Sequence, residues 1–382
     1  MLYSHHHFTH HLRFTEVRRL YWARMLGAAA GGLVAIFIPL YFLGLGYEFR
    51  EVLLYYVAYA VSNIAVCYPM MRLMVRIGPN RSMALGNLLL LPLFVGLITL
   101  DTHHWPLAAL AFLAALSNEA YFPALHGNFS ASETPGKDGR QVGMLSALTA
   151  FGGALSPAIG GFVAQAYGIS FNYGLAAGLF VLAAVPLLLA KEAVQEHDLS
   201  LKQLKGQRLL RDGVANAGFA VVMLTDAVLW PILVYLLVKN YAVVGGLGSI
   251  LVISSIATAL YVGRREESKG VKHYLHRGSI TLGLLNALRI FATSAGHVFG
   301  LNLLGGMGNQ LAGTTFMTRF YENANASARL AYIRLMEYAW FTGWGLAALL
   351  LYGLTFFLPT SAVLTAGLLL AIPASFLMSR IR

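Results

Sequence analysis

Residues 170–190 read SFNYGLAAGLFVLAAVPLLLA, a run of 21 residues that holds no charged side chain. A helix needs about 20 predominantly apolar residues to cross the hydrocarbon core of a bilayer. The run is long enough for that crossing and carries almost nothing that prefers water. It therefore predicts a helix whose surroundings are lipid.

The rest of the 382-residue chain has the same character. Hydrophobic residues make up 58% and charged residues 11%, whereas soluble proteins hold about 45–50% and about 25%. So few polar residues cannot cover the surface of a soluble fold. Runs of spanning length follow one another at roughly 20–45, 50–74, 82–101, 105–127, 141–167, 170–190, 214–238, 242–262, 278–296, 297–319, 330–352 and 355–378. We expect an all-α membrane protein with 12 transmembrane helices.

The basic residues set the expected orientation. When both termini are placed in the cytoplasm, every one of the 27 Lys and Arg except Arg50, Lys239 and Arg289 falls in a cytoplasmic segment. This bias follows the positive-inside rule. We therefore expect a bacterial-type cytoplasmic (inner) membrane protein. Its net charge of +11 then reflects topology and contact with anionic membrane lipids, and nucleic acid is not an expected partner.

A polar stretch divides the chain. In residues 191–213 leucines alternate with Lys and Arg, which predicts an amphipathic linker helix on the cytoplasmic surface. The linker separates a first half at 20–190 from a second half at 214–382, and a His- and Arg-rich cytoplasmic tail occupies 1–19. Each half would hold six of the expected helices.

The two halves resemble each other in sequence. Pro39 matches Pro231 at an offset of 192 residues, and Asn118 matches Asn309 at an offset of 191. The offset is close to half the chain length. A parallel repeat of this kind is a known transporter layout, with the binding site near the bilayer midplane between the halves.

Span 5 carries the sharpest motif. Its small residues and proline follow G-x8-G-x3-S-P-x2-G-G, at Gly143, Gly152, Ser156, Pro157, Gly160 and Gly161. Small residues let two helix backbones approach closely, and proline bends a helix. The span suits a flexible interface, with plain glycine-rich packing as the alternative. The pattern resembles the antiporter signature of the major facilitator superfamily, with Ser156 at a glycine position.

The loop between spans 2 and 3 resembles the same superfamily's cytoplasmic loop signature. Arg76 and Gly78 match it, and Arg81 falls one position late. Val75 stands at the aspartate position and Met71 at the first glycine position. By this resemblance, the loop and span 5 carry the gating motifs.

The resemblance implies two pseudo-symmetric six-helix halves that open a central cavity to one side and then to the other. It implies that spans 1, 4, 7 and 10 line this cavity. Spans 2, 5, 8 and 11 would form its sides, and spans 3, 6, 9 and 12 would brace it.

Three acids lie inside the expected spans, Glu119, Asp226 and Glu337. A charge at bilayer depth costs roughly 2.5–3.5 kcal/mol on insertion scales, so such residues are functional candidates. Asn309 and Gln310 lie at the middle of span 10. We predict a cargo and proton site in which Glu119 or Asp226 takes up a proton, because removal from water favours a neutral carboxyl.

Asn118, the aromatic residues Tyr121 and Phe122, and Trp230 complete the predicted site. The aromatic side chains would line an apolar cargo pocket or fill contacts between helices. The acids have an alternative role too, as structural hydrogen-bond acceptors or in a permanent salt bridge with Arg289 or Arg334. Arg289 by itself is expected to extend toward the outer membrane face, and His126 to lie at the cytoplasmic interface.

Span 4 departs from the superfamily's proton antiporters, which usually carry Arg-x-x-Gln-Gly there. It reads LSNEAYFP at 116–123, without arginine. Proton coupling would therefore use different residues. The His-rich tail, with His5, His10 and His11 and no cysteine, makes a poor metal site. We expect that tail to be disordered.

The sequence contains no Gly-rich phosphate loop and no catalytic metal or serine motif. We therefore expect neither an ATP motor nor an enzyme, and no cofactor. The expected function is a monomeric secondary active transporter, an antiporter that exports a small, partly apolar solute by alternating access linked to protons. A lipid or lysolipid flippase of the same fold and a non-transporting membrane sensor or scaffold are the open alternatives.

Overall fold

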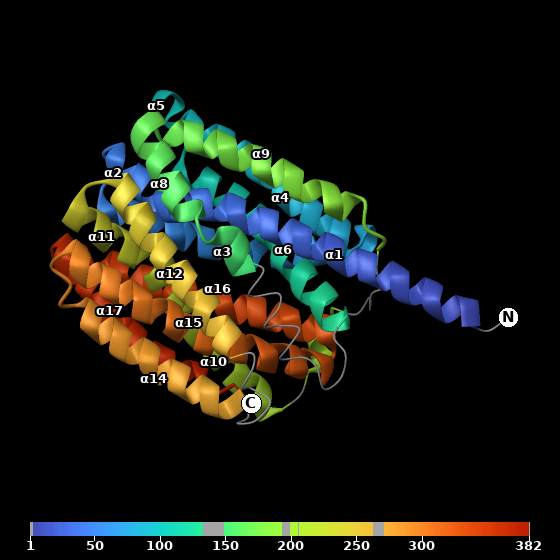
Figure 1. The fold of residues 1–382 in the computed structure, drawn as a ribbon. Helices are drawn as coiled ribbons and strands as arrows, with labels where there is room; N and C mark the ends of the chain where they lie inside the picture. Colours follow the sequence, from blue (N-terminus) through green and yellow to red (C-terminus); the bar gives the residue numbers. More distant parts are fainter. Residues whose placement is uncertain (1–2, 133–148, 193–198, 205, 263–270, 382) are drawn as a thin grey trace.

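The computed structural model describes residues 3–132, 149–192, 199–204, 206–262 and 271–381. Within these residues the chain is helical and forms no strand (Figure 1). The first half, blue to green, lies beside the second half, yellow to red. This confirms the all-α membrane fold that the apolar runs predict.

The first half is built from long helices joined by short turns. Its elements are α1 (Tyr3–Val34), η1 (Ala35–Phe37), α2 (Ile38–Gly44), α3 (Phe49–Ile77), α4 (Pro79–Ile98), α5 (Leu100–His103), α6 (Leu107–Ser132), α8 (Ser156–Tyr167) and α9 (Ile169–Leu188). Gly78 separates α3 from α4 at φ +94°, a conformation that side chains with a Cβ rarely adopt. Pro79 then begins α4, where its missing N–H costs nothing.

The second half follows the same plan. Its elements are η2 (Leu201–Gln203), α10 (Gln207–Leu224), the π-helical turn η3 (Thr225–Leu229), α11 (Trp230–Val238), α12 (Tyr241–Val262), α14 (Val271–Arg289), α15 (Ala295–Asn325), α16 (Arg329–Leu354) and α17 (Thr360–Met378). The turn between α14 and α15 lies at 290–294, earlier than the predicted boundary at 296. Arg289 is therefore the last residue of its helix, and Ser294 caps the next one by accepting from the His297 amide.

Eight of the described helical segments are long and apolar enough to cross a membrane by themselves. They cover the predicted spans 1 to 4, 6, 7, 8 and 12. The predicted spans 9, 10 and 11 correspond to α14, α15 and α16, and only the later part of span 5 lies in described residues. The number of 12 spans therefore stays a prediction.

Two predicted segments differ from the structure. The tail at 1–19 is not disordered, because α1 begins at Tyr3 and its first turns project beyond the bundle (Figure 1). The linker at 191–213 does not form one amphipathic helix, because its described part holds the three-residue turn η2 and α10 already begins at Gln207. In the described part of the linker, Glu192 accepts from the backbone amides of Asn80 and Arg81, and Arg208 pairs with Asp212.

The small residues of span 5 bring helices into close contact. A Cβ at Gly160 would overlap the backbone of Leu33 in α1, and one at Gly161 would overlap the backbone of Tyr241 in α12. In the second half, a Cβ at Gly245 would overlap the Pro157 backbone. Thus α8 packs on both its own half and the opposite half, as the motif predicts for an interface. Gly143 lies outside the described residues.

Gly161→Val should lower the stability of the protein by about 1–3 kcal/mol, because the added side chain overpacks the contact between α8 and α12. The measurement is the midpoint of thermal unfolding in detergent. Gly174→Val is the matched control, because a Cβ at Gly174 meets no atom within 4 Å among the described residues. Equal midpoints for the two variants would show that the close helix contact does not stabilise the fold.

Candidate functional site

A cavity of about 210 Å³ lies between α6 of the first half and α10, α15 and α16 of the second half. We call it the carboxyl cavity. Its walls are mostly aromatic and apolar, with a few polar groups, and its lining residues are Asn118, Phe122, His126, Asn216, Phe219, Met317, Phe320, Met336, Glu337, Trp340 and Phe341. It opens at the boundary between the halves, where the sequence repeat places a binding site.

Two buried carboxyls meet at this boundary. Glu119 of α6 is 1% exposed and Glu337 of α16 is 8% exposed. They belong to different halves and are close enough to interact electrostatically, and Cys67 of α3 interacts with both. Within the described residues neither carboxyl has an ion pair, and the polar neighbours of Glu119, Cys67 and Asn118, do not meet hydrogen-bond geometry with its oxygens. A buried carboxylate without a cation is costly, so this pair is unsuited to carrying two negative charges.

Arg334 does not neutralise Glu337, although the two lie three residues apart on one helix. Its Nη1 donates to the Leu199 carbonyl oxygen at 2.8 Å. Its guanidinium lies 4.4 Å from the Tyr68 ring centroid. The predicted alternative of a Glu337–Arg334 salt bridge is therefore not formed, because the arginine side chain reaches the linker and an aromatic face instead.

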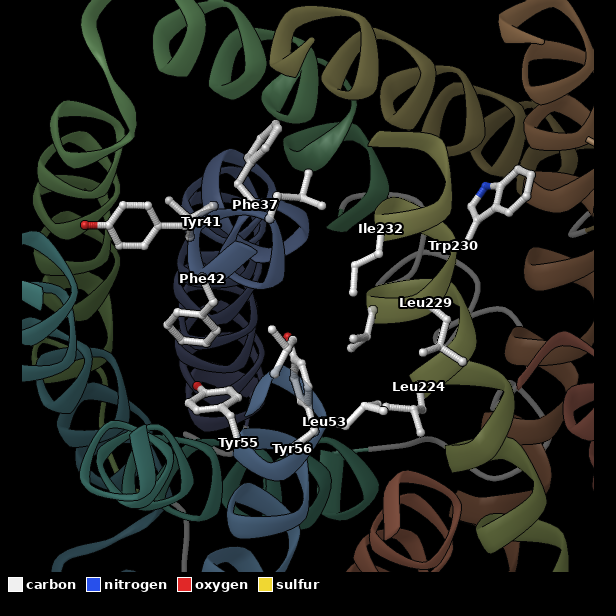
Figure 2. Close-up of a cluster of buried hydrophobic side chains, with 14 of the residues drawn as sticks. Phe37, Tyr41, Phe42, Leu53, Tyr55, Tyr56, Leu224, Leu229, Trp230 and Ile232 are labelled. Carbon is white, nitrogen blue, oxygen red and sulfur yellow. The ribbon is translucent and has the colours of Figure 1, made fainter. Parts of the chain in front are cut away.

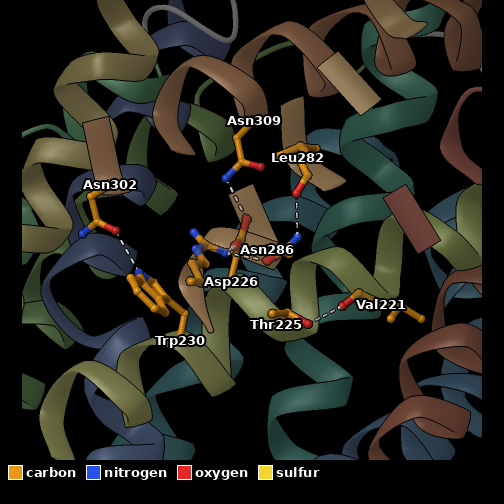
Figure 3. Close-up of polar contacts among 9 residues, drawn as sticks. Val221, Thr225, Asp226, Trp230, Leu282, Asn286, Asn302 and Asn309 are labelled. Atoms are coloured by element: carbon orange, nitrogen blue, oxygen red, sulfur yellow. Dashed lines mark hydrogen bonds and ion pairs between the residues drawn. The ribbon is translucent and has the colours of Figure 1, made fainter. Parts of the chain in front are cut away.

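Asp226, by contrast, is paired within its own half (Figure 3). Arg289 Nη1 donates to Asp226 Oδ1 and also to Asn286 Oδ1, the latter at 3.0 Å. Asn309 Nδ2 donates to the other Asp226 oxygen at 2.7 Å. Arg289 is fully buried, so the prediction that it extends toward the membrane face is wrong. It ends α14 facing Asp226, and pairing with a carboxylate satisfies its charge better than a path through lipid.

The helix around Asp226 departs from the α geometry. Thr225–Leu229 form a π-helical turn, and Pro231 follows directly in α11. Proline has no N–H and its ring crowds the carbonyl of residue 227 four positions earlier, so the α-helical ladder cannot continue through this point. Thr225 Oγ1 donates to the Val221 carbonyl oxygen at 3.1 Å, which satisfies one backbone acceptor nearby. Such turns occur often at functional sites.

A second cavity, of about 280 Å³, lies beside this turn; we call it the π-helix cavity. Asp226, Trp230, Asn302 and Asn309 are its polar and aromatic lining, and the remaining lining is largely apolar. Trp230 Nε1 donates to Asn302 Oδ1 at 2.8 Å, and the Arg289 guanidinium lies 4.7 Å from the Trp230 ring centroid. The hydrogen bonds fix the indole in one orientation (Figure 3).

The predicted site residues thus divide between two places. Asn118, Phe122 and Glu337 line the carboxyl cavity, and Asp226, Trp230 and Asn309 line the π-helix cavity. Glu119, Tyr121 and Gln310 line neither. The Tyr121 hydroxyl accepts from Arg24 Nη1 at 3.4 Å, and Gln310 Nε2 donates to Thr314 Oγ1 on its own helix at 2.6 Å.

Layers that combine both halves lie on either side of the cavities. Toward the turns at 45–48 and 99–106, aromatic residues of α2 and α3 face apolar residues of α10 and α11 (Figure 2). Toward the loops at 78 and 326–328, His126 Nδ1 and the Tyr321 hydroxyl form a 2.9 Å hydrogen bond between α6 and α15. Phe129 packs on Tyr321, with ring centroids 4.9 Å apart. His126 thus joins the two halves, a role that no local sequence pattern indicated.

Glu192 is a further residue that sequence reasoning missed. Its carboxylate accepts from the backbone amides of Asn80 at 3.0 Å and Arg81 at 2.9 Å, at the first turn of α4. A negative charge is favourable at a helix N-terminus. The expected loop motif has Val75 at its aspartate position, and Glu192 supplies a carboxylate to the same loop from 111 residues away. Arg76 is exposed, and Arg81 Nε lies 3.9 Å from Glu192 Oε1.

Within the described part of the chain, no three His, Cys, Asp or Glu side chains gather as a metal site. The polar groups that line the two cavities are the carboxyls of Glu337 and Asp226, asparagine amides, the His126 imidazole and the Trp230 and Trp340 indoles. Those groups suit the binding of an organic solute and the exchange of a proton.

Comparison with known proteins identifies the architecture. A sequence model described as Major Facilitator Superfamily matches residues 20–215. No curated protein sequence matches the chain.

Solved structures share the fold at low identity. The E. coli fucose:proton symporter FucP is 13% identical, over 95% of this chain and 97% of that one, with a TM-score of 0.67. The human organic anion transporter MFSD10 (TETRAN) is 11% identical over 96% and 99%, with a TM-score of 0.71. A bacterial homologue of the iron transporter ferroportin, in an outward-facing state, is 14% identical over 95% and 97%, with a TM-score of 0.67. At these identities the likeness shows the fold.

Asp226→Asn should destabilise the protein by about 3–5 kcal/mol, because it leaves the Arg289 charge buried without a counter-charge. Glu119→Gln should cost far less, because Glu119 has no ion pair among the described residues. Thermal unfolding in detergent measures both effects. The double variant, Asp226→Asn with Arg289→Gln, removes the unpaired positive charge and should recover part of the lost stability. Equal stability of Asp226→Asn and the wild type would mean that the ion pair contributes nothing.

Proposed function

This chain belongs to the Major Facilitator Superfamily, and we propose that it is a secondary active transporter that exchanges protons for a small, partly apolar solute. One observation carries the proposal. Glu119 and Glu337, from opposite halves, form a buried pair of carboxyls with no cation paired to either among the described residues.

The arrangement of the halves supports alternating access. Each cavity lies between layers to which both halves contribute. Separation of one layer while the other stays closed would open a path to one side of the membrane. The small-residue contacts of α8 with α12 provide a surface on which the halves can rock without side chains interlocking.

The carboxyl pair supports proton linkage. Two neighbouring carboxyls in apolar surroundings do not both ionise readily, so at least one of them stays protonated. Because one carboxyl belongs to each half, rocking changes their separation. The proton is then bound more tightly in one conformation than in the other, which is what coupling to a gradient requires.

We assign Asp226 a different role. Its two oxygens are taken by Arg289 and Asn309, so its charge is balanced within one half and stays balanced when the halves move. It would hold the π-helical turn in place beside the cavity. Of the two acids favoured from sequence, Glu119 therefore becomes the proton carrier, with Glu337 as its partner.

The remaining features of the proposal rest on sequence. The distribution of Lys and Arg supports an inner membrane of bacterial type with both termini in the cytoplasm. The span 5 motif supports export. We propose a monomer, because each chain holds both halves of the site. The flippase alternative is not favoured, because α8 packs on α12 and α3 packs on α16 where a lateral opening for lipid would lie.

The test uses purified protein in liposomes that contain a pH-sensitive dye. With a proton gradient imposed, organic cations, organic anions and sugars are added in turn. We expect at least one solute to drive proton flux, and Glu119→Gln and Glu337→Gln each to reduce that flux at least about tenfold.

Glu322→Gln is the matched control, because Glu322 lies near the end of α15, paired with Arg319 and outside both cavities. It should leave the flux unchanged. Solute-driven proton flux that persists in the Glu119→Gln, Glu337→Gln double variant would rule out the carboxyl pair. No flux with any solute, from folded protein, would instead support a sensor or scaffold.

A further inference from the structure

We propose that the carboxyl cavity binds a monovalent organic cation with an aromatic or aliphatic body, held by Glu337 and the surrounding aromatic rings. This names the cargo class and rests on the function proposed above. The cation and the proton would compete for the same pair of carboxyls.

Charge is unevenly distributed around the carboxyl cavity. Arg289 and Asp226 cancel each other and Arg289 does not line the carboxyl cavity. Glu337 lines the cavity, is more than nine-tenths buried, and has no hydrogen bond or ion pair within the described residues. Glu119 is buried outside the cavity lining and interacts electrostatically with Glu337. A cargo that enters this cavity therefore meets unbalanced negative charge or a proton that neutralises it.

The other charged and titratable groups near the pair do not supply a cation to balance it. They are Tyr59 and Cys67 of α3, Arg24 of α1, His126 of α6, Tyr321 of α15 and Arg334 of α16. Arg334 reaches Leu199 and Tyr68, and Arg24 lies over the Tyr121 ring at 5.7 Å. His126 is engaged with Tyr321. The cargo itself is left to supply the positive charge.

The walls fit an organic cation. Phe122, Phe219, Trp340 and Phe341 come from three helices and surround the volume next to Glu337. Aromatic faces attract ammonium groups, most strongly where water is excluded. At about 210 Å³ the cavity has room for a compact ion and not for a lipid with its acyl chains.

The same walls disfavour other solutes. Besides His126, which is bonded to Tyr321, and the Trp340 indole, the uncharged polar side chains of the lining are the amides of Asn118 and Asn216. Asn216 Nδ2 already donates to the Met336 carbonyl oxygen at 2.6 Å. A sugar needs many hydrogen bonds, and polar groups buried without them are costly. An anion would face a carboxyl and no free arginine in the described lining.

Exchange is balanced in charge. When a monovalent cation binds, one carboxyl of the pair releases its proton to water, and the positive charge of the cation replaces that of the proton, so the net charge of the pair and its occupant is unchanged. When the cation leaves, a proton returns. The cavity therefore alternates between two occupants of equal charge, one proton for each cation.

The test is binding to the purified full-length chain in detergent, which needs no gradient. The probe is benzyltrimethylammonium, and benzenesulfonate is the anionic control of similar size. We expect saturable calorimetric binding of the cation alone, with up to one proton released per cation in unbuffered solution and weaker binding at lower pH. Glu337→Gln should weaken the binding about tenfold or more, because a neutral amide replaces the counter-charge.

Trp340→Leu should weaken binding severalfold by removing an aromatic wall. Trp22→Leu is its control, because Trp22 is 53% exposed on α1 and lies outside the cavity lining. The comparison of cation with anion uses the wild type only, so it stands even where a variant fails to fold.

The outcomes separate this inference from the proposed function. Binding of benzenesulfonate but not of benzyltrimethylammonium overturns the cation site. Proton flux in liposomes driven by an anion or a sugar, without cation binding, also overturns it and leaves proton-linked transport standing. Cation binding that depends on Glu337 and Trp340, without any flux, supports the site and contradicts the transport function.

Discussion

The cost of a charge inside a hydrocarbon bilayer is the constraint on which the rest of this structure depends. The chain meets it in two ways. Asp226 and Arg289 neutralise each other within the second half, and the amides of Asn286 and Asn309 add one hydrogen bond to each. Glu119 and Glu337 are buried at the boundary between the halves and have no such cation in the described residues. A pair that is balanced within one rigid half is indifferent to rocking, whereas a pair split between the halves responds to it.

The same constraint acts on the backbone. Where Pro231 interrupts the α-helical ladder, the chain forms a π-helical turn, and this irregular segment lies beside a cavity rather than facing lipid. Small residues serve the opposite need in α8, where Gly160 and Gly161 let three helix backbones approach. The small residues of α8 therefore allow close contact between helices, whereas the π-helical turn holds polar groups at the cavity wall.

The sequence predicts what depends on local composition. Apolar runs located the helices, the rarity of acids in them singled out Glu119, Asp226 and Glu337, and the spacing of small residues predicted the close contacts of α8. Partners across the fold were not predictable in this way. Arg289 follows Asp226 by 63 residues and Tyr321 follows His126 by 195. The tendency of arginines near helix ends to extend toward the membrane surface does not say whether a particular arginine faces lipid or an acid. For Arg289 the answer depends on where α14 ends. Spacing of three residues suggested a Glu337–Arg334 pair, yet the arginine lies over the Tyr68 ring and donates to the Leu199 carbonyl oxygen.

The magnitude of the repulsion explains why a split pair can couple protons to movement. In an effective dielectric of about 20, two like unit charges repel by about 4 kcal/mol at 4 Å and about 2 kcal/mol at 8 Å. A separation of a few ångströms thus changes the affinity of the pair for its proton by more than about tenfold. In the proposed exchange, a monovalent cation beside Glu337 offsets the same repulsion, so proton and cation replace each other without a separate conformational signal. The halves need only move enough to change the distance between two side chains. The aromatic walls keep water from screening the repulsion between them.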